Sequence, residues 1–104
     1  MDAAFTALAE PRRRAILSLV RSEPRAASEI AQEFPDITQQ AVSLHLKVLH
    51  EAGLVDVRPQ GRQRLYLLRP EGLRPVRELL DELWPASLQR LKAAVEAEMR
   101  DERD

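Results

Sequence analysis

Residues 37–57 most constrain what this chain can fold into, because they change hydrophobic period on either side of a glycine. Apolar residues recur at helical spacing before Gly53 and alternate as in a strand after it. Thr38 can cap the helix by accepting a hydrogen bond from a first-turn amide. Gly53 suits the left-handed conformation that is common just past a helix C-terminus. The stretch therefore predicts an amphipathic helix that leads directly into a strand.

The predicted helix has two unlike faces. At about 100° per residue, its apolar face collects Val42, His45, Leu46 and Leu49. Its polar face collects Gln39, Gln40, Ser43, Lys47, His50 and Glu51. Amide, hydroxyl and ammonium groups are those that read base edges and hold phosphates in the DNA major groove. We therefore hypothesise that this is a DNA recognition helix.

The composition fits one soluble globular domain. The chain has 104 residues, of which 44% are hydrophobic and 32% charged, enough for a modest core. It has no cysteine, which excludes disulfides, thiolate metal sites and cysteine nucleophiles. The sequence has no charged-then-apolar signal segment, and no apolar run approaches the roughly 18 residues of a membrane span. We expect a cytoplasmic protein with no membrane partner.

The net charge of −1 hides an uneven distribution. Residues 11–69 carry ten Lys and Arg against six Asp and Glu, whereas residues 70–104 carry six against nine. A basic middle between acidic ends suits a central DNA-binding face with terminal segments turned elsewhere. An ordinary solvated, arginine-rich surface explains the same distribution equally well.

Three more helices are predicted before the recognition helix. Helical spacing places them over residues 2–9, 11–22 and 26–34. Pro11 suits the first turn of the second helix, and Pro35 ends the third because the residue before a proline avoids the helical region. Two helices joined by a short turn, the second with an exposed polar face, form the helix-turn-helix pattern.

Three consecutive arginines, Arg12, Arg13 and Arg14, open the second predicted helix. Positive charge at a helix N-terminus opposes the macrodipole, so another interaction is expected to retain them. Two alternatives stay open. The arginines hold DNA phosphates, or they form salt bridges with a partner helix.

A β-hairpin is predicted after Gly53. Its outgoing strand covers residues 54–58, its turn 59–61 and its returning strand 62–68, with Gly61 available for positive φ. Arginines lie at or near the tip: Arg58, Arg62 and Arg64. A lone two-stranded ribbon is marginal in water, so it must pack on the helices. A basic hairpin directly after a recognition helix is the wing of a winged helix, whereas in isolation it would be an ordinary surface hairpin.

The C-terminal third predicts helices with thin apolar stripes. Pro85 either kinks one long helix or separates two, and residues 100–104 are expected to fray. A thin stripe on a terminal helix suits a seam between two chains, so residues 1–10 and 73–99 are expected to form a dimer interface. The predicted interface residues are Phe5, Leu8, Val76, Leu80, Leu83, Trp84, Leu88, Leu91 and Val95. The alternative is a helix packed on its own domain.

Three segments of the chain resemble one family of repressors. Residues 7–17 look like the opening of the ArsR/SmtB-type winged helix-turn-helix repressors, residues 38–55 like their recognition helix and its exit, and residues 61–68 like their wing. The resemblance covers about residues 5–84. The tail, with Trp84 ahead of a leucine-spaced helix, resembles the non-metal members often found beside START-like lipid- or polyketide-binding proteins.

Together these features predict a single, mainly α-helical winged helix-turn-helix domain with a small β-hairpin, whose DNA-binding core and wing span residues 11–69. The resemblance implies a homodimeric repressor that binds a twofold-symmetric operator and occludes a promoter. The expected DNA contacts are Thr38, Gln39, Gln40, Ser43, Leu44 and Lys47 in the recognition helix, and Arg58, Arg62 and Arg64 in the wing. Leu44 departs from the long polar or basic residue common in the family. It lies at the edge of the apolar arc, where it either touches a thymine methyl or packs.

Sensing is where the chain departs most from its resemblance. Many such repressors bind metal through cysteine pairs or through Asp and His sets on the terminal helix. This chain has no cysteine, and its two histidines, His45 and His50, lie on different faces of the recognition helix. We expect no metal site and no cofactor, with His45 as a hydrogen-bonded structural residue. The inducer stays open between a small molecule, a protein partner and none.

Two other function classes compete with repression. A winged helix used only for protein–protein contact is favoured slightly by the low net charge, but the exposed polar set on the recognition helix argues against it. An enzyme is not expected, since the sequence has no glycine-rich phosphate loop, metal cluster or plausible nucleophile–base pair.

Overall fold

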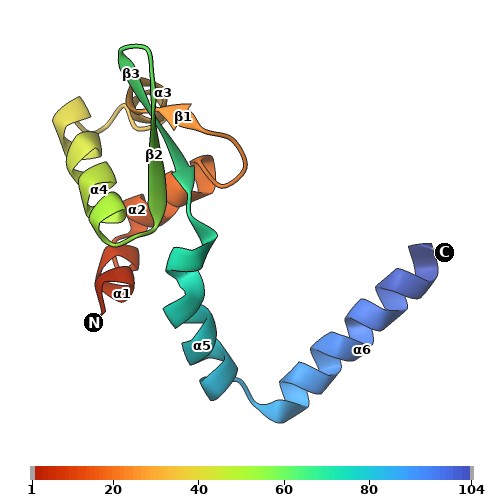
Figure 1. The fold of residues 1–104 in the computed structure, drawn as a ribbon. Helices are drawn as coiled ribbons and strands as arrows, with labels where there is room; N and C mark the ends of the chain where they lie inside the picture. The colour runs from red at the N-terminus through yellow and green to blue at the C-terminus, as the bar shows by residue number, and fades with distance from the viewer. Residues whose placement is uncertain (1, 104) are drawn as a thin grey trace.

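The computed structural model describes residues 2–103 and is mostly helical with one small antiparallel sheet, as predicted (Figure 1). In chain order its elements are α1 (Ala3–Leu8), α2 (Pro11–Leu19), β1 (Arg25–Ala26), α3 (Ala27–Gln32), α4 (Gln39–Glu51), β2 (Val55–Gln60), β3 (Gln63–Leu68), the 3₁₀ helix η1 (Pro70–Leu73), α5 (Arg74–Leu83) and α6 (Ala86–Arg103). Helices α2 and α3 are shorter than predicted, which is usual because helix ends fray and local signals place them loosely. None of the helices within residues 2–103 is long and apolar enough to cross a membrane.

The core lies where α2, α3 and α4 meet the base of the hairpin. Its largest fully buried side chains come from these elements and from the residues that flank them: Ile16, Val20, Ile30, Val42, Leu46, Leu49, Leu54 and Val55. In α4 the buried residues recur at four- and three-residue steps, so one stripe faces inward and the opposite face stays in solvent. Full burial of each such side chain stabilises the fold by roughly 1.5–3 kcal/mol.

The sheet contains a strand that the sequence analysis missed. β1 pairs antiparallel with β3, with Arg25 opposite Tyr66, and the strand order is β1-β3-β2. Two residues are too few to show alternation, so no sequence pattern could reveal β1. Because β1 anchors β3 to the residues just before α3, the hairpin is attached to the helix-turn-helix on one edge.

The predicted hairpin turn at residues 59–61 is wrong by two residues. β2 continues through Pro59 and Gln60, and the turn consists of Gly61 and Arg62, with Gly61 at φ +61°. Proline interrupts a central strand because it has no backbone N–H to donate to the neighbouring strands. β2, however, is an edge strand with a neighbour on one side only. Pro59 is therefore tolerated within the strand, opposite Arg64.

Pro85 separates two helices. Trp84, directly before it, has extended torsion angles (φ −74°, ψ 126°), as the steric effect of a following proline requires. Helix α6 then begins at Ala86 and continues to Arg103, so residues 100–103, which were expected to fray, are helical here. The remaining residue of that predicted tail, 104, lies outside the described residues.

Helix α6 projects away from the rest of the domain (Figure 1). The radius of gyration is 17.0 Å, well above the about 13 Å of a compact domain of 100 residues. Side chains from Ala86 to Arg100 are all exposed. The alternative in which this terminal helix packs on its own domain is therefore wrong for α6.

Candidate nucleic-acid interface

Both predicted ends of the recognition helix are confirmed. Thr38 Oγ1 accepts a hydrogen bond from the Ala41 amide at 3.0 Å. Gly53 adopts φ +75°, and just after it the Leu54 amide donates to the Leu49 carbonyl at 2.9 Å. These local contacts satisfy groups that a helix end leaves unpaired. The position of α4 is therefore fixed by its caps as well as by its buried stripe.

The outer face of α4 is polar and open to solvent. All six residues predicted to contact DNA from this helix are exposed: Thr38, Gln39, Gln40, Ser43, Leu44 and Lys47. Leu44 is 64% exposed, so it does not pack within the protomer. Of the two interpretations of Leu44, packing within the domain is wrong, and contact with another molecule remains.

The wing arginines are exposed but do not form one cluster. Arg58 pairs with Leu65 and Arg64 pairs with Pro59. Since paired residues share a face and faces alternate along a strand, Arg58 and Arg64 project from opposite faces of the ribbon. Arg62 lies in the turn at the tip. A DNA surface on one side of the wing can therefore contact Arg62 and either Arg58 or Arg64, but not all three arginines.

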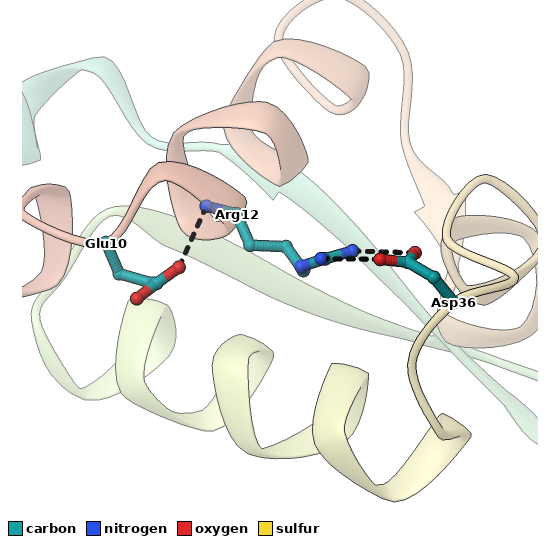
Figure 2. Close-up of polar contacts among 3 residues, drawn as sticks. All are labelled: Glu10, Arg12 and Asp36. Atoms are coloured by element: carbon teal, nitrogen blue, oxygen red, sulfur yellow. Dashed lines mark hydrogen bonds and ion pairs between the residues drawn. The ribbon is translucent and has the colours of Figure 1, made fainter.

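Arg12 braces the turn between α3 and α4 (Figure 2). Its guanidinium donates two hydrogen bonds to the Asp36 carboxylate at 2.9 and 2.7 Å and lies 5.5 Å from the centre of the Phe34 ring. The hydrogen bond from Arg12 is the main cause that lowers the pKa of Asp36 below its ordinary value. Arg12 is therefore engaged within the chain, by a partner 24 residues away that no local sequence pattern indicates.

Arg13 and Arg14 hold the C-terminal end of α1. Arg13 Nε donates to the Ala7 carbonyl at 2.7 Å, and Arg14 Nη1 donates to the Leu8 carbonyl at 2.6 Å. Positive charge at a helix C-terminus is favourable, which offsets the unfavourable position of both arginines at the start of α2. The salt-bridged partner helix does not describe Arg13 and Arg14, because the groups that they contact here are backbone carbonyls of the same chain.

His45 is a half-buried residue of α4 that joins this network, in agreement with the predicted structural role. Arg13 Nη1 donates to His45 Nδ1 at 3.3 Å. Burial, and then the positive charge of Arg13, lowers the pKa of His45. Arg13 thus connects the end of α1 to the recognition helix, while His50 on the same helix is exposed.

Gly72 holds the start of the C-terminal region against the exit of α4, a role that the sequence analysis missed. A Cβ at this position would collide with the Gly53 carbonyl oxygen and lie 2.8 Å from the Gly53 carbonyl carbon. Next to this contact, the Arg69 amide donates to the Leu54 carbonyl at 2.8 Å. The backbone of η1 therefore packs directly on the corner between the recognition helix and the wing.

The predicted dimer residues fall into two groups. Leu80, Leu83, Trp84, Leu88, Leu91 and Val95 are exposed, and so are Leu79 and Met99, which the predicted set lacks. Phe5, Leu8 and Val76 are only half-buried, and Leu8 packs partly on the protomer's own core. Along α5 and α6 the exposed residues recur mostly at three- and four-residue steps, so they form an apolar stripe on each helix.

The chain is similar to known proteins both in sequence and in structure. Residues 8–58 match a helix-turn-helix domain family. HTH-type transcriptional regulator Rv2034 of Mycobacterium tuberculosis is 45% identical over 87 residues, 84% of this chain and 80% of that protein. The crystal structure of an ArsR family transcriptional regulator has a TM-score of 0.72 at 30% identity and covers 88% of this chain and 94% of its own. The chain belongs to the ArsR family.

Two further similar proteins bear on function. Transcriptional repressor SdpR of Bacillus subtilis is 32% identical over 68 residues, 65% of this chain and 74% of that protein. A homodimeric winged helix-turn-helix DNA-binding domain from Mycobacterium bovis has a TM-score of 0.63 at 29% identity, with 80% of each chain covered. As a member of this family the chain is a winged helix-turn-helix transcriptional regulator and not an enzyme, as predicted.

Proposed function

We propose that this ArsR-family chain is a homodimeric repressor that binds a twofold-symmetric operator and occludes a promoter. The observation that carries the proposal is the outer face of α4. Exposed Gln39, Gln40 and Lys47 stand on a helix whose inner face is fixed in the core. A helix so anchored can enter a major groove, and its side chains can read base edges. The repressor SdpR and the homodimeric domain from M. bovis support the proposal.

The dimer follows from the apolar surface of α5 and α6. Eight large hydrophobic residues between Leu79 and Met99 are more than a third exposed in the protomer. Exposed apolar stripes of this kind mark interaction sites, and a second copy would cover the same stripe on both chains. The two copies of α4 would then reach successive major grooves about 34–36 Å apart.

Selection of bound fragments from a random DNA pool tests this proposal directly. We expect enrichment of an inverted repeat whose half-site centres are about 10–10.5 base pairs apart. Enrichment of a lone half-site would contradict the dimer. A pool that stays random would favour the alternative, a winged helix that contacts only proteins.

Gln40→Ala is expected to lower the preference for operator over random DNA while much of the non-specific binding remains. A bidentate glutamine–adenine contact discriminates by about 1–3 kcal/mol, or roughly 5- to 150-fold. Gln40 is exposed and alanine is a better helix former, so the fold should survive. Titration of both DNAs by gel shift measures the ratio. Equal weakening on operator and random DNA would mean that Gln40 does not read bases.

Arg62→Ala is expected to weaken binding to every DNA sequence and to make the dependence on salt less steep. Each lost phosphate contact lowers the slope of log K against log salt by about one. The matched control is Arg90→Ala, which removes an exposed arginine from α6, away from its apolar stripe. Titrations between low and moderate salt should show a changed slope for Arg62→Ala alone. A slope equal to that of the unaltered protein would remove the wing tip from the interface.

A further inference from the structure

Leu44 is an exposed apolar side chain on the outer face of α4, which is otherwise polar. It lies in the middle of α4 and is 64% exposed. Within residues 2–103, every other exposed large hydrophobic side chain lies between Leu79 and Met99, in or next to α5 and α6. In Figure 1, helix α4 lies at the left, whereas α6 extends away at the lower right.

The helix geometry determines where Leu44 faces. At about 100° per residue it lies roughly opposite the midpoint of the three buried residues Val42, Leu46 and Leu49. Its neighbours on the outer face are Gln40, one turn earlier, and Lys47, one turn later. Leu44 cannot turn inward unless the buried stripe of α4 leaves the core. Its methyl groups are therefore held outward, between an amide and an ammonium group.

The chemistry of the major groove offers such a side chain one favourable partner. Only thymine presents a methyl group there, at C5 of the pyrimidine, whereas the edges of guanine, cytosine and adenine present polar groups. Leucine has no donor or acceptor, so covering a polar edge would leave that edge without a hydrogen bond, which costs free energy.

We propose that Leu44 is a specificity-determining residue that contacts the C5 methyl of one thymine in each operator half-site. The inference rests on the proposed function, since it requires that α4 enter a major groove. It adds the identity of one base, next to the bases read by Gln40. A protein partner that covers Leu44 is the competing occupant, and the experiment below separates the two.

The test replaces each thymine of a selected operator by deoxyuridine, which removes only the methyl group and keeps base pairing. For the unaltered protein, removal of the one contacted methyl group from a single half-site should weaken binding about fourfold, the equivalent of the roughly 0.8 kcal/mol of one buried methylene-sized group. For Leu44→Ala the same replacement should have no effect. Alanine is a strong helix former and position 44 is exposed, so this variant should fold, as a thermal melt can verify.

Lys47→Ala is the matched control on the same face of α4. It should weaken binding to thymine and deoxyuridine operators by the same factor, so their ratio stays near fourfold. The proposal is overturned if no thymine methyl affects an operator that the protein still prefers. It is also overturned if methyl removal weakens the binding of Leu44→Ala as much as that of the unaltered protein. The same holds if Leu44→Ala binds the thymine operator with the affinity of the unaltered protein, as expected for a residue that contacts only a protein partner. If the unaltered protein shows no preference for any operator over random DNA, the proposed function is overturned as well.

Discussion

Leu91→Glu is expected to convert the proposed dimer into a monomer and to weaken operator binding by about 10²- to 10⁴-fold. Leu91 is 59% exposed in α6, beside Leu88 and Val95, so its substitution disturbs no core of the protomer. In a dimer it would be covered, and an unpaired carboxylate buried against apolar groups is strongly unfavourable. Once the two copies separate, the second half-site no longer benefits from a high effective concentration, which accounts for the large loss.

The matched control for this effect is Ala97→Glu. It adds the same charge to the same helix, but at about 100° per residue it lies on the side of α6 away from the apolar stripe. Light scattering after size-exclusion chromatography gives the oligomeric state, and gel shift gives the affinity. We expect Ala97→Glu to remain dimeric and to bind normally. A dimeric Leu91→Glu protein would show that α6 is not the seam, and a monomeric unaltered protein would refute the homodimer altogether.

Gly72→Ala is expected to lower the free energy of unfolding by about 3 kcal/mol, at the upper end of the usual overpacking cost. The added Cβ would collide with the backbone of Gly53 and lie 3.1 Å from Leu54 Cα. Backbone cannot turn aside as a flexible side chain can, so either η1 or the corner between α4 and β2 must move. For a domain of this size the melting temperature should fall by more than roughly 10 °C.

Gly61→Ala is the comparison variant for Gly72→Ala, because it introduces backbone strain without a steric collision. Gly61, unlike Gly72, has a positive φ, +61°, but a Cβ there would meet nothing within 4 Å. Its substitution should cost only about 1–2 kcal/mol, the penalty of the left-handed region. Thermal denaturation followed by circular dichroism measures both variants. Equal losses would indicate that η1 is free to shift away from Gly53.

The recognition helix was the most predictable part of the molecule. Its N-cap at Thr38, its left-handed Gly53 and its buried face are all set by residues within one or two helical turns of one another. The same holds for the separation of α5 and α6, because Pro85 acts on the residue directly before it. The resemblance of residues 7–17, 38–55 and 61–68 to the ArsR repressors is likewise local, and the comparisons confirm the family.

The predictions that were wrong or missing concern partners that are distant in the sequence. The role of Arg12 depends on Asp36, which reaches it only because α3 and α4 fold back over α2. Strand β1 exists because β3 pairs with it, and Gly72 is constrained only because Gly53 lies against it. Leu44 is an error of a different kind, since at about 100° per residue it lies roughly opposite the buried residues of α4 and not at the edge of the apolar arc, as its exposure confirms.

The sequence alone thus determined the main helices, the β-hairpin and the family, because hydrophobic period, caps and proline sterics act over a few residues. Only the tertiary structure decided which polar groups were already engaged and which surfaces were left open. It assigned Arg12, Arg13 and Arg14 to contacts within the chain, and it left Leu44 and the stripe of α6 exposed. The physical reason is that hydrogen bonding and burial depend on which segments meet in space, and chain folding brings together residues that no local pattern connects.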